Sequence, residues 1–252
     1  MISKKIHQIW VGDKPAPYKI MESWRRYCDK FGWEYYLWDE SSIENLNLVN
    51  RHIYDFYKYE SKIQDRSRYQ GMSDIARLEI VNQFGGYYFD CDFYSWQNDI
   101  EKIVNLDHNM GVFSTENLYP SDCTNEKTKS WWVKFEGNFN SSHFICNGTF
   151  YANPNNNILT DTINGLDEVF NKNKLVEWDN HNITLENVNW LTCGCWQLSN
   201  FSKKHPFILL SPKFVFSSIE YAIQNKETFI PQIISSYLDN HDENRLMILN
   251  EL

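Results

Sequence analysis

Two aspartates separated by one residue are the strongest chemical signal in the sequence. Asp90 and Asp92 follow Tyr87-Tyr88-Phe89, a run with high strand propensity. Side chains at positions i and i+2 of a regular strand point the same way, so at a strand end both carboxylates can face one divalent cation. Mg²⁺ and Mn²⁺ prefer oxygen ligands and keep coordination positions for substrate phosphates. The pair therefore indicates metal-assisted chemistry on a diphosphate, whose developing negative charge the cation neutralises.

A second charged pair precedes these aspartates by one predicted helix. Asp74 and Arg77 are three residues apart, so they share one face of that helix. Arg77 is suited to bind a phosphate or a sugar hydroxyl, and Asp74 to accept hydrogen bonds from sugar hydroxyls. Each feature alone also fits a simpler role: Asp74 as an acid near a helix N-terminus, Arg77 as a surface ion pair, the D-x-D as solvated turn carboxylates. The joint pattern favours a functional site.

The elements that must position these residues alternate between strand and helix. Strand-like runs over 6–11 and 33–38 flank an amphipathic helix over 18–31, which Gly32 ends. This β-α-β pattern predicts a parallel sheet that binds ligands at the carboxyl ends of its strands. Further on, the sequence predicts helical structure over 41–60, a polar loop over 61–72, and a helix from an N-cap at Ser73 to Gln83, ended by Gly85-Gly86.

The second half of the sequence is less regular, and it shows no repeat and no linker that would separate two domains. Strands are expected at 110–113, 149–152, 207–210 and 213–216, and a helix at 158–170. An acceptor site is expected in this half, with candidate side chains Trp131, Trp132, Trp178, Trp190, Trp196, Asn138 and Asn147.

Composition excludes several classes of protein. The 252 residues are 42% hydrophobic and 23% charged, which is ordinary globular usage. The net charge of −9 disfavours a nucleic-acid binder, which needs a basic face. No secretory h-region and no uncharged apolar run of about 20 residues is present. The six cysteines are therefore expected to be reduced thiols, and the protein to be cytoplasmic.

Several segments, in chain order, resemble one enzyme family. They are Lys5–Gly12 (KIHQIWVG), Ser23-Trp24, Tyr36-Leu37-Trp38, Ser73–Leu78 (SDIARL) and Phe84–Asp92 (FGGYYFDCD). Together they resemble the DXD-containing sugar transferases of glycosyltransferase family 32, which includes bacterial capsule and polysaccharide transferases and fungal mannosyltransferases. The same motifs are similar to those of the catalytic domain of large clostridial glucosylating toxins. The resemblance covers residues 4–96, with a weaker echo at 147–154 and 192–199.

The resemblance implies a fold and an activity. It implies an α/β fold of GT-A type, a nucleotide-sugar-binding sandwich with a mainly parallel central sheet. One catalytic domain would span 1–252, with a donor- and metal-binding half over about 1–110 and an acceptor-binding half over about 111–252. The implied reaction is metal-assisted hexose transfer with retention, by same-face attack, from a nucleotide sugar, a UDP-sugar in preference to a GDP-sugar, with Mn²⁺ or Mg²⁺. The implied acceptor is an oligosaccharide or lipid-linked glycan of bacterial capsule or lipopolysaccharide, which suggests peripheral association with the inner face of the membrane.

The resemblance also assigns roles to individual residues. Trp10 matches a position whose ring stacks on the donor base, although a tryptophan there also fits the core. Asp74 and Arg77 match the pair that holds the donor sugar and phosphate. Asp90 matches a residue that contacts ribose or sugar as well as metal, and Asp92 one that ligates the metal. Tyr88 either lines the donor pocket or packs in the core.

The C-terminal segment departs from the family pattern. The family closes its site with a segment that carries His and a Ser-Trp pair, whereas no Trp follows Pro231 here. His241 or Asp239 either completes the metal site or belongs to a solvated polar tail. A degenerate transferase scaffold that only binds a sugar or nucleotide is therefore an alternative. A phosphatase of the haloacid-dehalogenase type also uses D-x-D, but Tyr94 stands where that motif has Thr or Val.

Overall fold

One mixed sheet organises the structure. The computed structural model describes residues 2–60, 66–95, 99–102, 110–115, 144–173, 198 and 208–210. Within them the strand order is β2-β1-β3-β5-β4-β6. The strands are β1 (Lys5–Ile9), β2 (Glu34–Trp38), β3 (Gly86–Phe89), β4 (Met110–Thr115), β5 (Phe144–Ala152) and β6 (Ile208–Leu210). β5 pairs antiparallel with β3 and β4, and the other pairs are parallel. The described strands other than β5 therefore share one direction, which confirms the predicted mainly parallel sheet.

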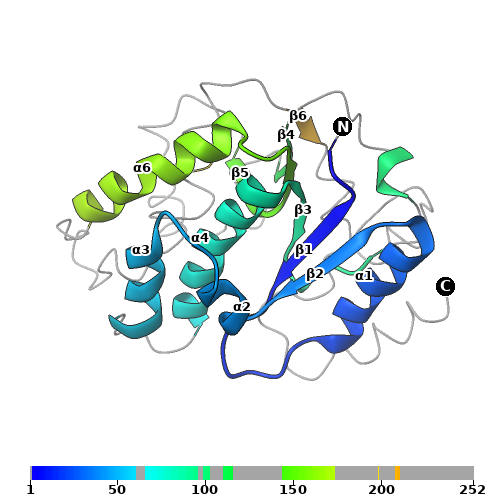
Figure 1. The fold of residues 1–252 in the computed structure, drawn as a ribbon, viewed down its shortest axis with the longest axis horizontal. Helices are drawn as coiled ribbons and strands as arrows, with labels where there is room; N and C mark the ends of the chain where they lie inside the picture. Colours follow the sequence, from blue (N-terminus) through cyan, green and yellow to red (C-terminus); the bar gives the residue numbers. More distant parts are fainter. Residues whose placement is uncertain are drawn as a thin grey trace, which may run out of the picture.

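Helices cover both faces of this sheet. They are α1 (Tyr18–Phe31), α2 (Glu40–Glu44), α3 (Arg51–Asp55), the π-helical turn η1 (Phe56–Glu60), α4 (Arg66–Phe84), the short 3₁₀ helix η2 (Ile100–Lys102) and α6 (Asn157–Asn173). Figure 1 shows α1 on one side of the sheet and α3, α4 and α6 on the other. Among the helices of these described segments, none has the length and apolar character of a membrane span.

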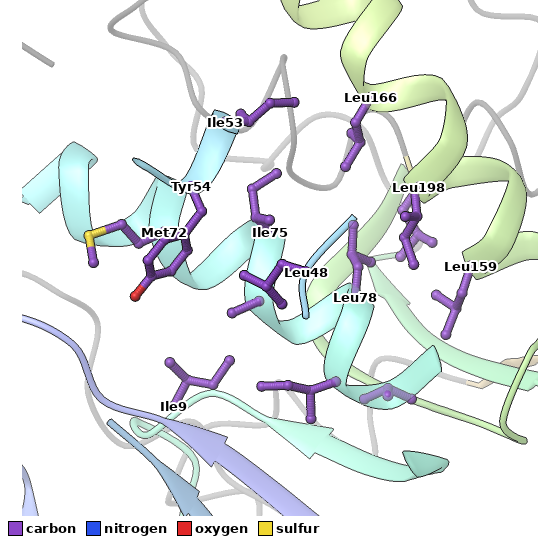
Figure 2. Packing of buried hydrophobic residues seen from close by; sticks show 14 of the residues in the cluster. Ile9, Leu48, Ile53, Tyr54, Met72, Ile75, Leu78, Leu159, Leu166 and Leu198 are labelled. Carbon is purple, nitrogen blue, oxygen red and sulfur yellow. The ribbon is translucent and has the colours of Figure 1, made fainter. Parts of the chain in front are cut away.

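Alternating strand side chains create a core on each face. Tyr88 of β3 points toward α4 and α6, into a cluster that includes Ile75 and Leu78 of α4. Figure 2 shows how Leu159 and Leu166 of α6 face α4 in this cluster. Tyr87 and Phe89, which flank Tyr88 in β3, and Tyr151 of β5 belong to the other cluster. This cluster packs on Trp24 and Tyr27 of α1. Residues that follow β3 therefore emerge between two well-packed layers.

The helix predicted over 18–31 is confirmed with the same bounds. Ile20, Trp24 and Tyr27 are buried on one side of α1, as their spacing predicts. Gly32 follows in the left-handed conformation, with φ of 72°, which glycine adopts without steric cost. The Trp24 ring stacks on Phe89, with 4.3 Å between ring centroids, and this fixes α1 against the strand that leads to the aspartates.

The predicted start of α4 is wrong. Ser73 is not an N-cap, because the helix already begins at Arg66 and 66–72 is helix instead of loop. Tertiary packing explains the difference. A Cβ at Gly71 would lie 2.5 Å from the ring of Tyr57, so glycine allows α4 to approach η1 closely. Met72 is fully buried there. The predicted helical stretch 41–60 is likewise interrupted, because 46–50 is not helical.

The aspartate pair is not on a regular strand. β3 ends at Phe89, and the Phe93 amide donates to the Asp90 carbonyl at 3.1 Å, which closes a turn over 90–93. The i, i+2 argument for parallel carboxylates therefore fails, although the pair does follow directly after a strand. The strand predicted at 213–216 lies outside the described residues. Cys28 and Cys91 are buried free thiols.

Candidate functional site

Arg77 is the centre of a buried polar cluster that joins the two charged pairs. Its side chain is 7% exposed. Nη1 lies 3.0 Å from Asp90 Oδ1 and 3.0 Å from the Asn147 carbonyl. Nη2 lies 2.9 Å from Ser73 Oγ and 3.4 Å from Asp74 Oδ1, and Nε donates to the Ser73 carbonyl at 3.2 Å. Three of these contacts are hydrogen bonds and two are ion pairs, so protein groups surround the guanidinium. Arg77 therefore holds Asp74 and Asp90 in position.

The Tyr88 hydroxyl fixes the orientation of the Asp90 carboxylate. Tyr88 is fully buried, and its hydroxyl donates to Asp90 Oδ1 at 2.7 Å. Burial raises the pKa of this hydroxyl well above its usual range, so it stays a donor. The Arg77 guanidinium lies over the same ring at 4.8 Å. The Tyr88 hydroxyl and Arg77 Nη1 both contact Oδ1 of Asp90. Because the Asp90 side chain is 32% exposed, Oδ2 is the oxygen that remains for a ligand within the described segments.

Asp74 is held by a partner from the far half of the chain. Asn147 Nδ2 donates to Asp74 Oδ1 at 2.7 Å, and both residues are buried. Asp74 lies well inside α4, so the simpler role as a helix N-terminal acid is excluded. Asn147 was expected in the acceptor site, whereas its side chain and carbonyl both serve this cluster. Its sequence context carries no signal for that role, because 73 residues separate the two side chains.

A buried glutamine supports the turn backbone and was not predicted as a site residue. Gln8 of β1 is fully buried and donates through Nε2 to the Asp90 carbonyl at 3.3 Å. Tyr35 of β2 donates to Gln8 Oε1 at 2.9 Å. The Asp90 amide donates to the Gly148 carbonyl of β5, and the Cys91 thiol contacts a carbonyl of β1. Three strands thus fix the position of the turn.

Trp10 is partly exposed just beyond β1, so it is not the core tryptophan that its sequence also allowed. Its ring nitrogen donates to the Lys14 carbonyl at 3.0 Å. Gly12, in the same loop, has φ of 108°, and a Cβ there would lie 2.9 Å from the Tyr69 ring of α4. The Gly12 amide donates to Glu40 Oε1 at 3.2 Å. The loop that carries Trp10 is therefore held between α2 and α4.

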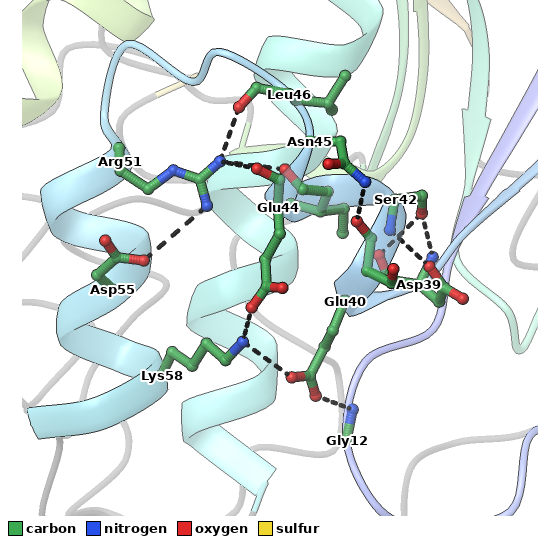
Figure 3. Close-up of polar contacts among 12 residues, drawn as sticks. Gly12, Asp39, Glu40, Ser42, Glu44, Asn45, Leu46, Arg51, Asp55 and Lys58 are labelled. Carbon is green, nitrogen blue, oxygen red and sulfur yellow. Dashed lines mark hydrogen bonds and ion pairs between the residues drawn. The ribbon is translucent and has the colours of Figure 1, made fainter.

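Ion pairs and hydrogen bonds connect α2, α3 and η1 next to the loop that carries Trp10 (Figure 3). Lys58 of η1 forms ion pairs with Glu40 and Glu44 of α2, and this pairing raises the pKa of the lysine. Arg51 donates to the carbonyls of Glu44 and Leu46 at the end of α2. Because Glu40 also contacts Gly12, the network connects α2 and η1 to the residues next to Trp10.

Asp90 and Asp92 are the candidate metal ligands that the described residues contain. Asp90 and Asp92 lie in the same turn, each partly buried. In the segments that the structure covers, no group of three or more His, Cys, Asp or Glu side chains converges on one point. Asp239 and His241, expected as further ligands, lie outside the described residues. Two carboxylates suit a hard cation that takes its remaining ligands from phosphate and water.

Residues 17–110 match the family model of the glycosyltransferase sugar-binding region containing the DXD motif. The matched segment runs from the residue before α1 to the first residue of β4. It contains Asp74, Arg77, Tyr88, Asp90 and Asp92, while Trp10 precedes it. No curated protein matches the sequence.

Solved structures of glycosyltransferases are similar to this fold. One is a glycosyltransferase involved in the glycosylation of the major capsid of PBCV-1, with 11% identity, coverage of 98% of both chains and a TM-score of 0.51. Another is the PaToxG glycosyltransferase, with 15% identity, coverage of 81% of this chain and 69% of that chain, and a TM-score of 0.49. A third is the UDP-bound glycosyltransferase domain of the YGT toxin, with 12% identity, coverage of 98% and 89%, and a TM-score of 0.42. The likeness to the first structure, together with the mainly parallel sheet, agrees with the expected GT-A type of fold.

Proposed function

We propose that the protein is a glycosyltransferase that moves a hexose from a nucleotide sugar to a glycan acceptor. The observation that carries this proposal is the buried cluster in which Arg77 joins Asp74 to Asp90. The cluster lies at the carboxyl end of β3, where sheets of this class bind their ligands. The match of residues 17–110 to a sugar-binding DXD region supports the same conclusion.

The donor site would use Trp10 and the two aspartates of the cluster, of which Asp90 is the more exposed. Trp10 offers a ring face to the nucleotide base at the end of β1. Asp74 and Asp90 accept hydrogen bonds from sugar and ribose hydroxyls, and Tyr88 keeps Asp90 turned toward them. We propose a UDP-sugar in preference to a GDP-sugar, on the basis of the sequence resemblance to bacterial transferases.

Mn²⁺ or Mg²⁺ fits this site, because carboxylate oxygens are the ligands that these ions prefer. Asp90, through Oδ2, and Asp92 would hold the ion, and Asp239 or His241 remains a proposed additional ligand. When bound, the ion would supply positive charge to the leaving diphosphate.

The protein groups act mainly by fixing charge in position. The Arg77 guanidinium is buried beside Asp90, so its positive charge acts in a region with little water. We propose transfer with retention by same-face attack. In this step the acceptor hydroxyl attacks the anomeric carbon from the side that the diphosphate leaves, and its proton passes to a leaving phosphate oxygen.

The acceptor and cellular place are also proposals. An oligosaccharide or lipid-linked glycan of a bacterial capsule or lipopolysaccharide fits the sequence resemblance. It would place the enzyme in the cytoplasm, with peripheral contact to the inner face of the membrane. The net charge of −9 argues against a nucleic-acid partner.

Donor turnover tests this function. The protein is incubated with UDP-glucose, UDP-galactose, UDP-N-acetylglucosamine or GDP-mannose and Mn²⁺, and released nucleoside diphosphate is measured. One donor should be cleaved, EDTA and Asp92→Asn should each abolish cleavage, and NMR should show that the first sugar product keeps the donor's anomeric configuration. A donor that binds in a metal-dependent way but is never cleaved would favour the degenerate scaffold, and an inverted product would overturn retention.

A further inference from the structure

A basic hollow with tyrosines on its wall lies on the α1 side of the sheet. Its volume is about 570 Å³, within the range of about 300–1,000 Å³ that is typical of small-molecule sites. Its wall includes Tyr18, Lys19, Arg25 and Arg26 of α1, Leu37 near the end of β2, and Tyr94 beyond the aspartate turn. The residues assigned above to the donor and the metal do not line it, so the hollow is a separate site.

The charge of the hollow favours an anion. Lys19, Arg25 and Arg26 oppose a single carboxylate, that of Glu22, and 3 − 1 leaves two positive charges. Arg25 lies 3.4 Å from Glu22. Lys19 and Arg26 form no ion pair with any residue that the structure describes. In a chain with a net charge of −9, such a local excess of positive charge indicates complementarity to a negatively charged ligand.

The apolar part of the wall favours a sugar over a bare anion. Tyr18 is 71% exposed and Leu37 is 38% exposed, although both are large hydrophobic side chains. Tyr94 is partly exposed on the same wall. Tyrosine rings present an apolar face and a polar hydroxyl, which suits the mixed surface of a pyranose.

Two hydrogen bonds hold Tyr94 in place next to the DXD turn. Trp24 Nε1 donates to the Phe93 carbonyl at 2.7 Å, and the Ser95 amide donates to Ser23 Oγ at 3.0 Å. Both donors and acceptors are buried, so the backbone on each side of Tyr94 is fixed to α1. Tyr94 is two residues from Asp92, and two residues span at most about 7 Å. A ligand in the hollow would therefore lie beside the turn that carries the proposed metal site.

We propose that the hollow binds the anionic part of the acceptor, a sugar that carries a phosphate or a carboxylate. The identification as an acceptor site rests on the proposed function, whereas the binding of an anionic sugar does not. The first turns of α1, the last residues of β2 and the turn after β3 all lie at the carboxyl edge of the sheet, so an acceptor held here lies at the same edge as the donor.

Ligand-observed NMR titrations of the full chain test the proposal. The probes are glucose 6-phosphate and glucuronate, with glucose and inorganic phosphate as controls. Both anionic sugars should bind more tightly than either control. The double variant Arg25→Gln/Arg26→Gln should weaken their binding by at least about tenfold. Lys30→Gln, which removes one charge from α1 outside the hollow, should bind them as the unaltered protein does.

The outcomes separate this proposal from the proposed function. Unchanged binding in the double variant, or equal binding of glucose or inorganic phosphate, would overturn the proposal. So would arginine-dependent binding to phosphatidylglycerol vesicles without binding of either anionic sugar, which would assign the hollow to the membrane. UDP binding in Mn²⁺, measured on the same samples, should be equal in all three proteins. Failure of the unaltered chain to bind UDP would contradict the donor site, but it would not affect the conclusion that the hollow binds anionic sugars.

Discussion

Arg77 contacts protein groups that its place in the sequence does not predict. Its position and charge suggested direct contact with a phosphate. The groups that contact its guanidinium are protein groups, and they include the carboxylates of Asp74 and Asp90. The structure thus supports a role in which Arg77 positions the carboxylates. Asn147 and Gln8 belong to the same cluster. The sequence offered Asn147 only as an acceptor candidate and Gln8 only as part of a family-like segment, because an ordinary buried amide becomes a site residue through its contacts.

Replacement of Arg77 by lysine should damage the cluster although the charge is kept. Lysine has three N–H donors and no planar fork, so it cannot reproduce the three hydrogen bonds and two ion pairs of the guanidinium in one geometry. We expect the free energy of unfolding to fall by about 1–3 kcal/mol, as measured by urea denaturation. Arg25→Lys, at an exposed arginine, is the control and should change stability little. Equal stability of the Arg77→Lys variant and the unaltered protein would show that the contacts are weak.

His7 should give the fold a measurable pH dependence. The ring is fully buried, with Nε2 at 2.8 Å from the Gly85 carbonyl and the Trp38 indole donating to Nδ1 at 3.2 Å. These partners fix a neutral ring protonated on Nε2. Burial lowers the pKa of His7 from 6.5 to about 4. Between these values the unfolded chain binds more protons than the folded one, so stability rises as the pH increases.

The contribution of His7 should therefore be complete above pH 6.5 and lost as the pH falls toward 4. It amounts to about 3 kcal/mol. Chemical denaturation at several pH values measures this contribution. The His7→Gln variant should be less stable at pH 7, but its free energy of unfolding should change less with pH between 4 and 6.5. An identical slope in the variant would assign the pH dependence to other groups.

At the scale of elements, Glu79 joins the irregular segment before α3 to the helix that carries the cluster. Its carboxylate accepts from the Val49 amide at 2.6 Å, the Asn50 amide at 2.8 Å and Asn50 Nδ2 at 3.2 Å. Burial raises the pKa of Glu79, but these donors oppose the shift. Asn50 also donates to the Ile163 carbonyl of α6, so one acidic side chain organises α3, α4 and α6.

Glu79→Gln should destabilise the protein, because the amide turns one acceptor into a donor that faces other N–H groups. We expect a loss of about 1–3 kcal/mol in the free energy of unfolding. Glu22→Gln, which changes an exposed carboxylate, should cost much less. A variant at position 79 as stable as the unaltered protein would mean that water replaces these hydrogen bonds.

The accuracy of the sequence predictions varied among elements for a physical reason. α1 was predicted with its exact bounds because an apolar stripe and a terminal glycine are local signals. The start of α4 was missed because its first turns are polar, and they are helical through packing such as that of Gly71 against Tyr57. The pair follows a strand as predicted, but the turn that carries it is not predicted, because its closing hydrogen bond from Phe93 is not encoded in residue types.

At the scale of the whole molecule, the sheet joins distant parts of the chain into one site. β5, from the second half, lies between β3 and β4 and contributes Asn147 and Gly148 to the cluster. The buried cluster around Arg77 therefore includes residues from both halves of the chain. The α/β class and the edge of the sheet at which the site lies were predictable from the β-α-β pattern. The antiparallel insertion of β5 was not, because strand order depends on contacts between remote segments.

Equilibrium binding of UDP tests whether the turn at Asp90 and Asp92 binds a nucleotide sugar through a metal ion. Calorimetry would compare the unaltered protein with Asp92→Asn, each in Mn²⁺ and in EDTA, and Asp13→Asn would serve as a control at an exposed aspartate. We predict that UDP binds the unaltered protein and the control only in Mn²⁺, and that Asp92→Asn weakens this binding by at least about tenfold. Binding that is independent of both the metal and Asp92, or no binding at millimolar UDP, would contradict a nucleotide-sugar site at this turn.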